Sequence, residues 1–399
     1  MSSKVETTVI VWGDRHFPAR IVQEQCRALQ DSGAVDGVMF ADQLVNFIPI
    51  QLWNERNTPM AKILRDPDSH SDAYAIAGYA FAAAPKLNIT LSTDSVRRPP
   101  VELIQSMLTL ANITEGKASF HIGAGENKQC QPYGHNRAQG VGRLEELFRI
   151  FELLVNSDGH PVDFRGKYHV LDKASIGSAF PYRPKLWGLG GGPKLMEHTI
   201  RYADGLAVTA PIVWTNGDQA AEVVTDVRRR ISAIGRDPAM FRFGAWCPAL
   251  VHPDPQVLEQ ACHNRLVRFM TGIFGRIHMP DWEKEGLALP APTNWSYFKD
   301  LLPYNTDDRF IEDVIAKVTP EHVRKGWFMG SPEEVATQMK PFVDAGVDWL
   351  LPLDYLPLIR EPDDAPAGFA RTIELCAELK RSAAKKVLRK EAGPGLDAA

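Results

Sequence analysis

The chain of 399 residues predicts an α/β fold, a closed (β/α)8 TIM barrel. Two observations support this fold class. Short β-branched or apolar runs alternate with longer amphipathic stretches along nearly the whole sequence, as expected for strands and helices in turn. A parallel crossover requires a helix between two strands, so this alternation indicates parallel strands. Eight such units favour a closed barrel over an open sheet.

The predicted strands are short and rich in β-branched, aliphatic and aromatic residues. They span residues 7–12, 36–42, 87–93, 117–123, 185–190, 204–210, 242–250 and 348–354. Between them, helical periodicity is clearest at residues 143–156, 218–235 and 331–346. The last of these helices is predicted to begin after Ser331, which forms a capping-box pattern with Glu334, and to end at Gly346.

Residues 1–380 are predicted to form a single barrel domain, followed by a solvated basic tail at residues 381–399. Two stretches, residues 47–71 and 276–305, do not fit the loops of a minimal barrel. They are either surface insertions or lids that place apolar side chains over a ligand. The second interpretation follows because long ordered loops of barrels gather at the catalytic face.

The composition narrows the class of protein. With 44% hydrophobic residues and a net charge of -4, the chain has an ordinary globular composition and gives no reason to expect nucleic acid or an anionic membrane as a partner. No apolar run is long enough to span a bilayer, and the first residues lack a secretory signal pattern. The five cysteines are scattered without a C-x-x-C pair, so we expect a cytoplasmic location.

The stretch "FHIGAGENKQ" resembles the start of a dinucleotide-binding turn. That motif needs a third glycine where this chain has Lys128, and no helix is predicted before about Gly142, so the interpretation fails. What remains is a strand whose carboxyl end delivers Glu126 onto a loop. Side chains at such ends face the active site of a barrel, although Glu126 could instead only cap a turn.

A better anion site follows the predicted strand 185–190. Three glycines, Gly190, Gly191 and Gly192, precede Pro193 and Lys194, where a helix is predicted to begin. Glycines expose backbone N–H groups, a helix start adds a positive dipole end, and proline suits the first turn. We favour a phosphate-binding corner over a plain tight turn, because a plain turn does not need three glycines.

Polar residues follow the first three predicted strands as well: Asp14, Arg15 and His16, then Asp42 and Gln43, then Thr93 and Asp94. A barrel rim gathers such residues in one place, which favours a functional site there. We predict no metal, because no His-x-His follows the first strand and the histidines are scattered. A G-x-S-x-G nucleophile elbow is also absent from the sequence.

Together, "GAGENKQCQPYGHNRAQGVGRLEEL", "VDFRGKYHVLDKASI", "GLGGGPKLMEHTIRYADGLAVT" and "MGSPEEVATQMKPFVDAGVDWLLP" make the chain resemble the luciferase-like oxidoreductases, which use flavin or the deazaflavin F420. The resemblance covers nearly the whole length. Within this superfamily the sequence is most similar to the mycobacterial phthiodiolone ketoreductase type and, more distantly, to F420-dependent glucose-6-phosphate dehydrogenase. It implies a (β/α)8 barrel of the luciferase-like type with lid insertions.

The resemblance also implies roles for individual residues. Asp42 and Gln43 stand where the family has an Asp-His pair beside the deazaflavin ring. Residues 91–93 match a bulged third strand with a non-proline cis peptide that supports the ring, and Glu126 matches the active-site acid. The implied cofactor-binding set is Asp42, Leu91, Ser92, Thr93, Gly125, Glu126, Gln129, Gly190, Gly191, Gly192 and Thr209.

Two departures from the family pattern matter. Gln43 replaces a histidine of many F420-dependent relatives, and glutamine cannot act as a general base because it does not titrate. Alcohol oxidation by the usual histidine route is therefore not expected. Ile212 and Gly326 stand where the sugar-phosphate branch has basic residues, so glucose 6-phosphate is not expected as the substrate.

The predicted activity is F420-dependent hydride transfer between deazaflavin and a bulky apolar carbonyl, enone or alcohol, with reduction favoured. Glu126 would donate a proton, its pKa raised by an apolar pocket, while Gln43 polarises the substrate oxygen and Asp42 fixes the geometry. The predicted substrate pocket contains Trp12, Asp14, His16, Phe47 and Trp246, some of which could equally be core residues. The alternatives are an FMN-dependent two-component monooxygenase and a non-catalytic flavin-binding barrel. We also expect a homodimer.

Overall fold

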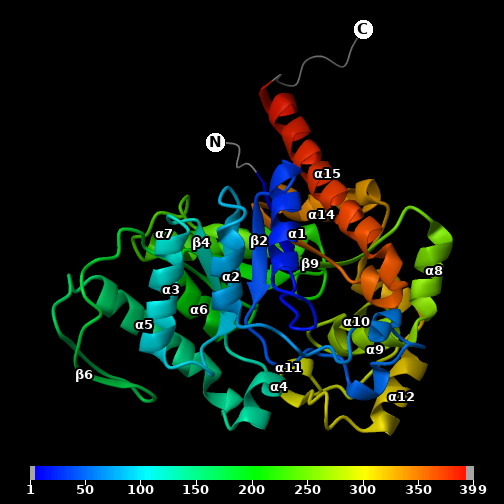
Figure 1. Cartoon of the computed structure of the whole chain (residues 1–399), viewed down its shortest axis with the longest axis horizontal. Coiled ribbons are helices and arrows are strands. Elements are labelled where there is room, and N and C mark those ends of the chain that lie inside the picture. Colours follow the sequence, from blue (N-terminus) through cyan, green and yellow to red (C-terminus); the bar gives the residue numbers. More distant parts are fainter. Residues whose placement is uncertain (1–4, 392–399) are drawn as a thin grey trace.

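The computed structural model describes residues 5–391, and they form the predicted closed barrel of eight parallel strands with helices around it (Figure 1). The sheet order is β10-β9-β11-β1-β2-β3-β4-β7-β8, and a further pairing of β8 with β9 closes the ring. The barrel strands are β1 (Glu6–Ile10), β2 (Gly37–Ala41), β3 (Asn88–Asp94), β4 (Ala118–Gly123), β7 (Lys185–Leu189), β8 (Gly205–Thr209), β9 (Arg242–Val251) and β11 (Trp349–Asp354).

A helix follows each barrel strand before the next one begins, which is the pattern that the sequence predicts. These helices are α1 (Arg20–Asp31), α2 (Ala73–Phe81), α3 (Pro100–Ile113), α5 (Gly140–Val155), α6 (Pro193–Tyr202), α7 (Gly217–Ala233), α14 (Pro332–Ala345) and α15 (Ala365–Glu391). The predicted capping box of α14 is present: Ser331 accepts from the Glu334 N–H, the Glu334 side chain accepts from the Ser331 N–H, and Gly346 ends the helix.

The sequence did not predict three strands. A hairpin of β5 (Val162–Arg165) and β6 (Val170–Ala174) lies outside the barrel, and the short strand β10 (Phe328–Gly330) pairs with β9. Glu146 of α5 positions the hairpin, because its buried carboxylate accepts backbone N–H groups from residues 167–169. This contact joins segments too far apart in sequence for a periodicity argument to detect.

The two long insertions contain short helices: η1 (Ile50–Leu52) and η2 (Pro59–Lys62) in the first, and α10 (Pro280–Lys284) and α11 (Tyr297–Asp300) in the second. They pack with the other helices between β9 and α14, which are α8 (Pro255–His263), α9 (Arg265–Phe274), α12 (Asp308–Lys317) and α13 (Pro320–Gly326). One hydrophobic cluster joins them, with Leu52 and Trp53 from the first insertion and Trp282 from the second. Figure 1 shows α9 to α12 in the lower part of the molecule, with α11 beside α4 (Asn127–Cys130), away from the projecting C-terminal part of α15.

Two further groups of apolar side chains make up the rest of the core. The larger one lies between the strands and the surrounding helices. The smaller one fills the barrel with large side chains, among them Met39, Trp187 and Trp349, so the barrel is packed and does not form a channel. At its C-terminal end, α15 continues across residue 381 to Glu391, so the first part of the predicted tail is helical; residues 392–399 lie outside the described residues.

Candidate functional site at the carboxyl ends of the strands

Because the barrel is closed and parallel, the residues after each strand lie at the same end of the molecule. This end therefore brings together most of the predicted site residues: those after β1, β2, β3, β4, β7 and β8. Short α4 follows β4 at this end, and α11 from the second insertion contacts it. The insertion thus lies next to the loop that carries Glu126.

Asp42 is the most heavily bonded of the predicted residues, with only 7% of its side chain exposed. Its carboxylate accepts a hydrogen bond from the Thr93 hydroxyl at 2.7 Å. It also pairs with Arg97 at 3.2 Å and with Arg98 at 3.1 Å. Asp42 therefore joins the ends of β2 and β3, and its position allows it to orient the adjacent Gln43.

Gln43 contacts a histidine that the sequence analysis did not select. Its Nε2 lies 3.2 Å from Nε2 of His70, and Nδ1 of His70 lies 3.4 Å from the Asp14 carboxylate. An isolated antiparallel bridge between Asp14 and His70 brings the two loops together. No sequence signal could have identified His70, because it lies within an insertion and reaches the site only through this bridge.

Glu126 has a charged partner that the sequence analysis did not predict. Its carboxylate is 2.7 Å from the ammonium of Lys128, which is 2% exposed and also donates to the Val45 carbonyl at 3.0 Å. The expectation that no helix begins before about Gly142 is wrong, since Glu126 is the N-cap of the one-turn helix α4 and α5 begins at Gly140.

The side-chain amide of Gln129 in α4 forms hydrogen bonds with the backbone of the loop after β2. Its Oε1 accepts from the backbone N–H of Leu44 at 2.8 Å, and its Nε2 donates to the Val45 carbonyl at 2.5 Å. The predicted role of Gln129 in cofactor binding does not fit this geometry. Gln129 instead fixes the loop after β2 against the loop after β4, which holds Gln43 and Glu126 in a defined relation.

The predicted bulge and cis peptide in the third strand are not found. β3 pairs regularly with β2 and β4, and the one cis peptide bond of residues 5–391 joins Ala210 to Pro211. Leu91 is fully buried in the main core, while Ser92 and Thr93 are buried but polar. Regular hydrogen bonding on both sides keeps the strand extended, so the resemblance did not extend to this detail.

The glycine corner has the geometry that anion binding needs. Gly190 has a φ of +132°, and Gly192 is the N-cap of α6, with no side chain bonded to the helix start. A Cβ on Gly192 would meet nothing within 4 Å, whereas one on Gly191 would lie 2.5 Å from a methyl group of Val213. Open space therefore borders free backbone N–H groups at the start of a ten-residue helix, which fits a phosphate group. Gly125, with a φ of +83°, is the other predicted glycine at this end.

Trp246, in the middle of β9, is the register neighbour of Thr209, the last residue of β8. The Trp246 indole N–H donates to Nδ1 of His121 at 3.4 Å, and Trp246 packs against the small cluster that fills the barrel. Trp246 is thus partly a core residue, as the sequence analysis allowed. His121 itself stacks on Trp187 at 4.8 Å, and burial lowers its pKa to about 3.

The other predicted pocket residues lie at the rim of the same end. Trp12 is 36% exposed, with its ring 6.0 Å from His70, and His16 pairs with Asp66 at 3.5 Å. Phe47 contacts Phe274 at 5.1 Å and Tyr355 at 5.9 Å between ring centres. These contacts place Phe47 in an aromatic cluster formed by the insertions and by the residue after β11.

Two tyrosines near Glu126 were not predicted. Burial raises the pKa of both Tyr297, on the second insertion, and Tyr355, after β11, and the Glu126 charge adds to each effect. The ring centres of Tyr297 and Phe274 also lie 6.4 Å apart, in an edge-on arrangement. The insertion therefore brings aromatic side chains toward Glu126, which supports the lid interpretation over a plain surface insertion.

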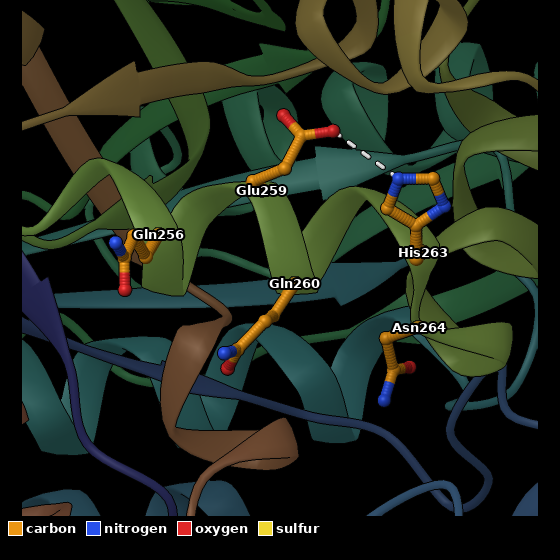
Figure 2. Close-up of a pocket in the computed structure, with 5 residues that line it drawn as sticks. All are labelled: Gln256, Glu259, Gln260, His263 and Asn264. Carbon is orange, nitrogen blue, oxygen red and sulfur yellow. Dashed lines mark hydrogen bonds and ion pairs between the residues drawn. The ribbon is translucent and has the colours of Figure 1, made fainter.

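Two surface depressions differ in their relation to this end. One is lined by Asn127, Gln131, Arg137 and Lys299 among others, so it lies between the loop after β4 and the second insertion. The other lies on α8 and the residue that follows it. Figure 2 shows its polar lining, in which His263 forms a hydrogen bond of 3.1 Å with Glu259. None of the predicted site residues lines this second depression. Within the described residues, no group of three or more His, Cys, Asp or Glu side chains could hold a metal ion.

The fold and the position of the polar residues place the chain among the (β/α)8 barrel proteins that bind ligands at the carboxyl ends of their strands. Residues 20–349 match the family model of the luciferase-like monooxygenases, and the chain belongs to this family. None of the helices in residues 5–391 is long and apolar enough to cross a membrane.

The relatives include F420-dependent oxidoreductases. The chain is 28% identical over 345 residues to the phthiodiolone/phenolphthiodiolone dimycocerosates ketoreductase of Mycobacterium kansasii, covering 84% of this chain and 91% of that protein. It is 22% identical to the F420-dependent glucose-6-phosphate dehydrogenase of Amycolatopsis mediterranei, covering 67% and 72%. An F420-dependent secondary alcohol dehydrogenase, solved with an F420-acetone adduct, has a similar fold, with a TM-score of 0.67, 18% identity and coverage of 94% and 98%.

Solved structures of monooxygenases share the fold to a similar degree. A long-chain alkane monooxygenase has a TM-score of 0.65 at 15% identity, covering 97% of this chain and 92% of that structure. The comparisons therefore support a deazaflavin or flavin cofactor, and they support an oxidoreductase in broad terms.

Proposed function

We propose that this protein is an F420-dependent oxidoreductase that reduces a carbonyl or conjugated double bond of a bulky apolar substrate. The observation that carries this proposal is the open glycine corner at the barrel end that also holds Gln43 and Glu126. Curated relatives that span most of the chain and are named as ketoreductases favour reduction. A cytoplasmic location and a homodimer stay predictions.

The residues present fit the cofactor at two places. The N–H groups at the start of α6 and the open space at Gly192 would receive its phosphate. The ends of β2, β3 and β4, fixed by the Asp42 and Gln129 hydrogen bonds, would border its ring system. When bound, F420 supplies a hydride-transferring carbon and reacts poorly with oxygen.

The chain's own residues would position the substrate and exclude water. Phe47, Tyr297 and Tyr355 offer apolar surface for a bulky substrate near Glu126. Gln43 can donate an amide N–H to a substrate oxygen, and the Glu126 carboxylate, held by Lys128, can orient a water that delivers the proton. Asp14, His16 and Trp12 would form the rim on the side of β1.

A fluorescence titration of the purified protein with F420 and FMN, each oxidised and reduced, tests the cofactor assignment. We expect tight binding of F420 and weak binding of FMN, followed by consumption of reduced F420 with a ketone such as acetophenone. Tight binding of FMN alone, with oxygen uptake when a flavin reductase is added, would instead identify an FMN-dependent monooxygenase, which the alkane monooxygenase neighbour supports as the second candidate. Binding without turnover across a broad carbonyl panel would indicate a non-catalytic flavin-binding barrel.

A further inference from the structure

His70 occupies a position between two other residues at the strand ends. Its ring is 7% exposed, with Gln43 on one side and Asp14 on the other. Backbone hydrogen bonds from Arg15 to Ser69 and from Ser71 to Gly13, both of 2.7 Å, hold the two loops together. The ring is therefore fixed in place by the backbone, and its two nitrogens face different partners.

The contacts define the protonation of the neutral ring. When the Gln43 amide donates to Nε2, that nitrogen is an acceptor, so the ring proton resides on Nδ1 and points to Asp14. This hydrogen bond uses one of the two N–H groups of the Gln43 amide, so the second N–H stays available to another acceptor.

We propose that His70, held by Asp14, is the positioning residue that sets the orientation of the Gln43 amide; this inference rests on the proposed function. With one Gln43 N–H bound to Nε2 of His70, the amide is fixed in place, and its second N–H can donate to the oxygen of a substrate carbonyl. Gln43 stands where F420-dependent relatives have a histidine. In this chain the orientation of the Gln43 side chain would depend on a different histidine, His70.

Other charged groups near His70 have partners of their own. Asp66 accepts from Ser69 and pairs with His16, while Asp68 accepts from the Asn46 N–H and from Tyr304.

On the neighbouring elements, Asp42 binds Arg97 and Arg98, and Asp72 caps α2 and pairs with Arg98. Arg15 lies next to Asp14 in the loop after β1. Asp14 is thus the carboxylate that faces the ring, and it favours the Nδ1–H form.

The first test does not depend on the cofactor. In ¹⁵N spectra of protein labelled at histidine, His70, assigned by its loss in His70→Gln, should show a protonated Nδ1 and an unprotonated Nε2 at neutral pH. In Asp14→Ala this tautomer should lose population. A His70 ring that carries its proton on Nε2, or that does not respond to Asp14→Ala, would overturn the inference.

The second test uses ketone reduction with reduced F420 and acetophenone. His70→Gln should lower kcat by about 10- to 100-fold and leave KM and F420 affinity nearly unchanged, because the Gln43 amide loses the ring nitrogen that fixes it. A wild-type kcat in His70→Gln refutes the role.

His263→Gln serves as the matched control, since His263 forms a comparable imidazole–carboxylate pair with Glu259 on the surface of α8 (Figure 2). It should retain the wild-type kcat and KM. The tests also separate the two proposals. If F420 does not bind to the wild type, the proposed function fails, whereas the tautomer of His70 still decides whether Asp14 and His70 interact as described.

Discussion

The ammonium of Lys128 lies 2.7 Å from the carboxylate of Glu126, although only 2% of the lysine side chain is exposed. The same ammonium donates to the Val45 carbonyl at 3.0 Å. This contact joins the loop after β4 to the loop after β2, so the two loops that carry Glu126 and Gln43 move together. Lys128 thereby fixes the Glu126 carboxylate in a position where it can organise a donor or a water.

Glu126→Gln should lower kcat for ketone reduction by about 100-fold or more, because the amide cannot hold the proton that the carboxylate directs. The affinity for F420, measured by fluorescence titration, should stay close to that of the wild type. The substitution leaves a buried ammonium without its counter-charge, so Glu126→Gln combined with Lys128→Met controls for loss of stability. Wild-type turnover in Glu126→Gln would rule out this role.

Gly192→Ala should weaken F420 binding without harming the fold. Its φ of -68° suits alanine, and the added Cβ meets no protein atom within 4 Å, so it occupies only the space assigned to the phosphate. Gly78→Ala in α2 is the control, because Gly78 has no positive φ and its added Cβ would make only an ordinary contact, at 3.7 Å, with Ile113. Equal F420 affinity in Gly192→Ala and wild type, at unchanged melting temperature, would argue against the phosphate corner.

Asp354, at the end of β11, should make the protein less stable as the pH rises. Burial raises the pKa of this carboxyl to about 7, while its Oδ1 accepts from Val251 and Leu356 and its Oδ2 has no hydrogen-bond partner. The native state therefore retains the proton that the unfolded chain releases near pH 4. Between about pH 4 and 7 the free energy of unfolding should fall by up to about 1.4 kcal/mol per pH unit.

Urea unfolding of Asp354→Asn over this range measures the effect, because the amide keeps Oδ1 and does not titrate. The difference in stability between wild type and Asp354→Asn should shrink or reverse as the pH rises toward 7. Asp363→Asn, at an exposed carboxylate nearby, should show no such trend. A pH-independent difference for Asp354→Asn would contradict the predicted protonation.

His121, inside the barrel, should make the protein less stable as the pH falls, which is the opposite of the effect of Asp354. Burial lowers its pKa to about 3 from an ordinary value of 6.5, so the unfolded chain takes up a proton that the native ring refuses. Stability contributed by the neutral ring is complete above about pH 6.5 and is lost as the pH falls toward 3. Relative to wild type, His121→Phe should therefore become more stable as the pH falls through this range.

Acid unfolding followed by tryptophan fluorescence checks this expectation, with His160→Phe at an exposed position as the control. His121→Phe also removes the acceptor of the Trp246 indole N–H, which lowers stability at every pH by an amount that does not change with pH. The slope against pH, rather than the absolute stability, is thus the relevant measurement. Equal slopes for His121→Phe and wild type would show that His121 titrates normally.

The strands were the part of the fold that the sequence could predict. All eight barrel strands lie within two residues of their predicted ends, because a parallel strand buried on both faces appears as a continuous apolar run. The helix start at Pro193 and the capping box at Ser331 were also predicted, since both depend on neighbouring residues only. The hairpin β5–β6 and α4 were missed, because contacts with distant residues stabilise them: Glu146 binds the hairpin, and Gln129 of α4 binds Leu44.

By itself, the sequence determined the alternation of strands and helices, and with it the barrel and the polar residues at the ends of its strands. Only the tertiary structure decided the partners of those residues: Lys128 for Glu126, the two arginines for Asp42, and His70 for Gln43. The physical reason is that apolar periodicity is local, whereas charge pairs and hydrogen bonds at a barrel end join loops from separate strands. The charge state and orientation of each site residue depend on those partners.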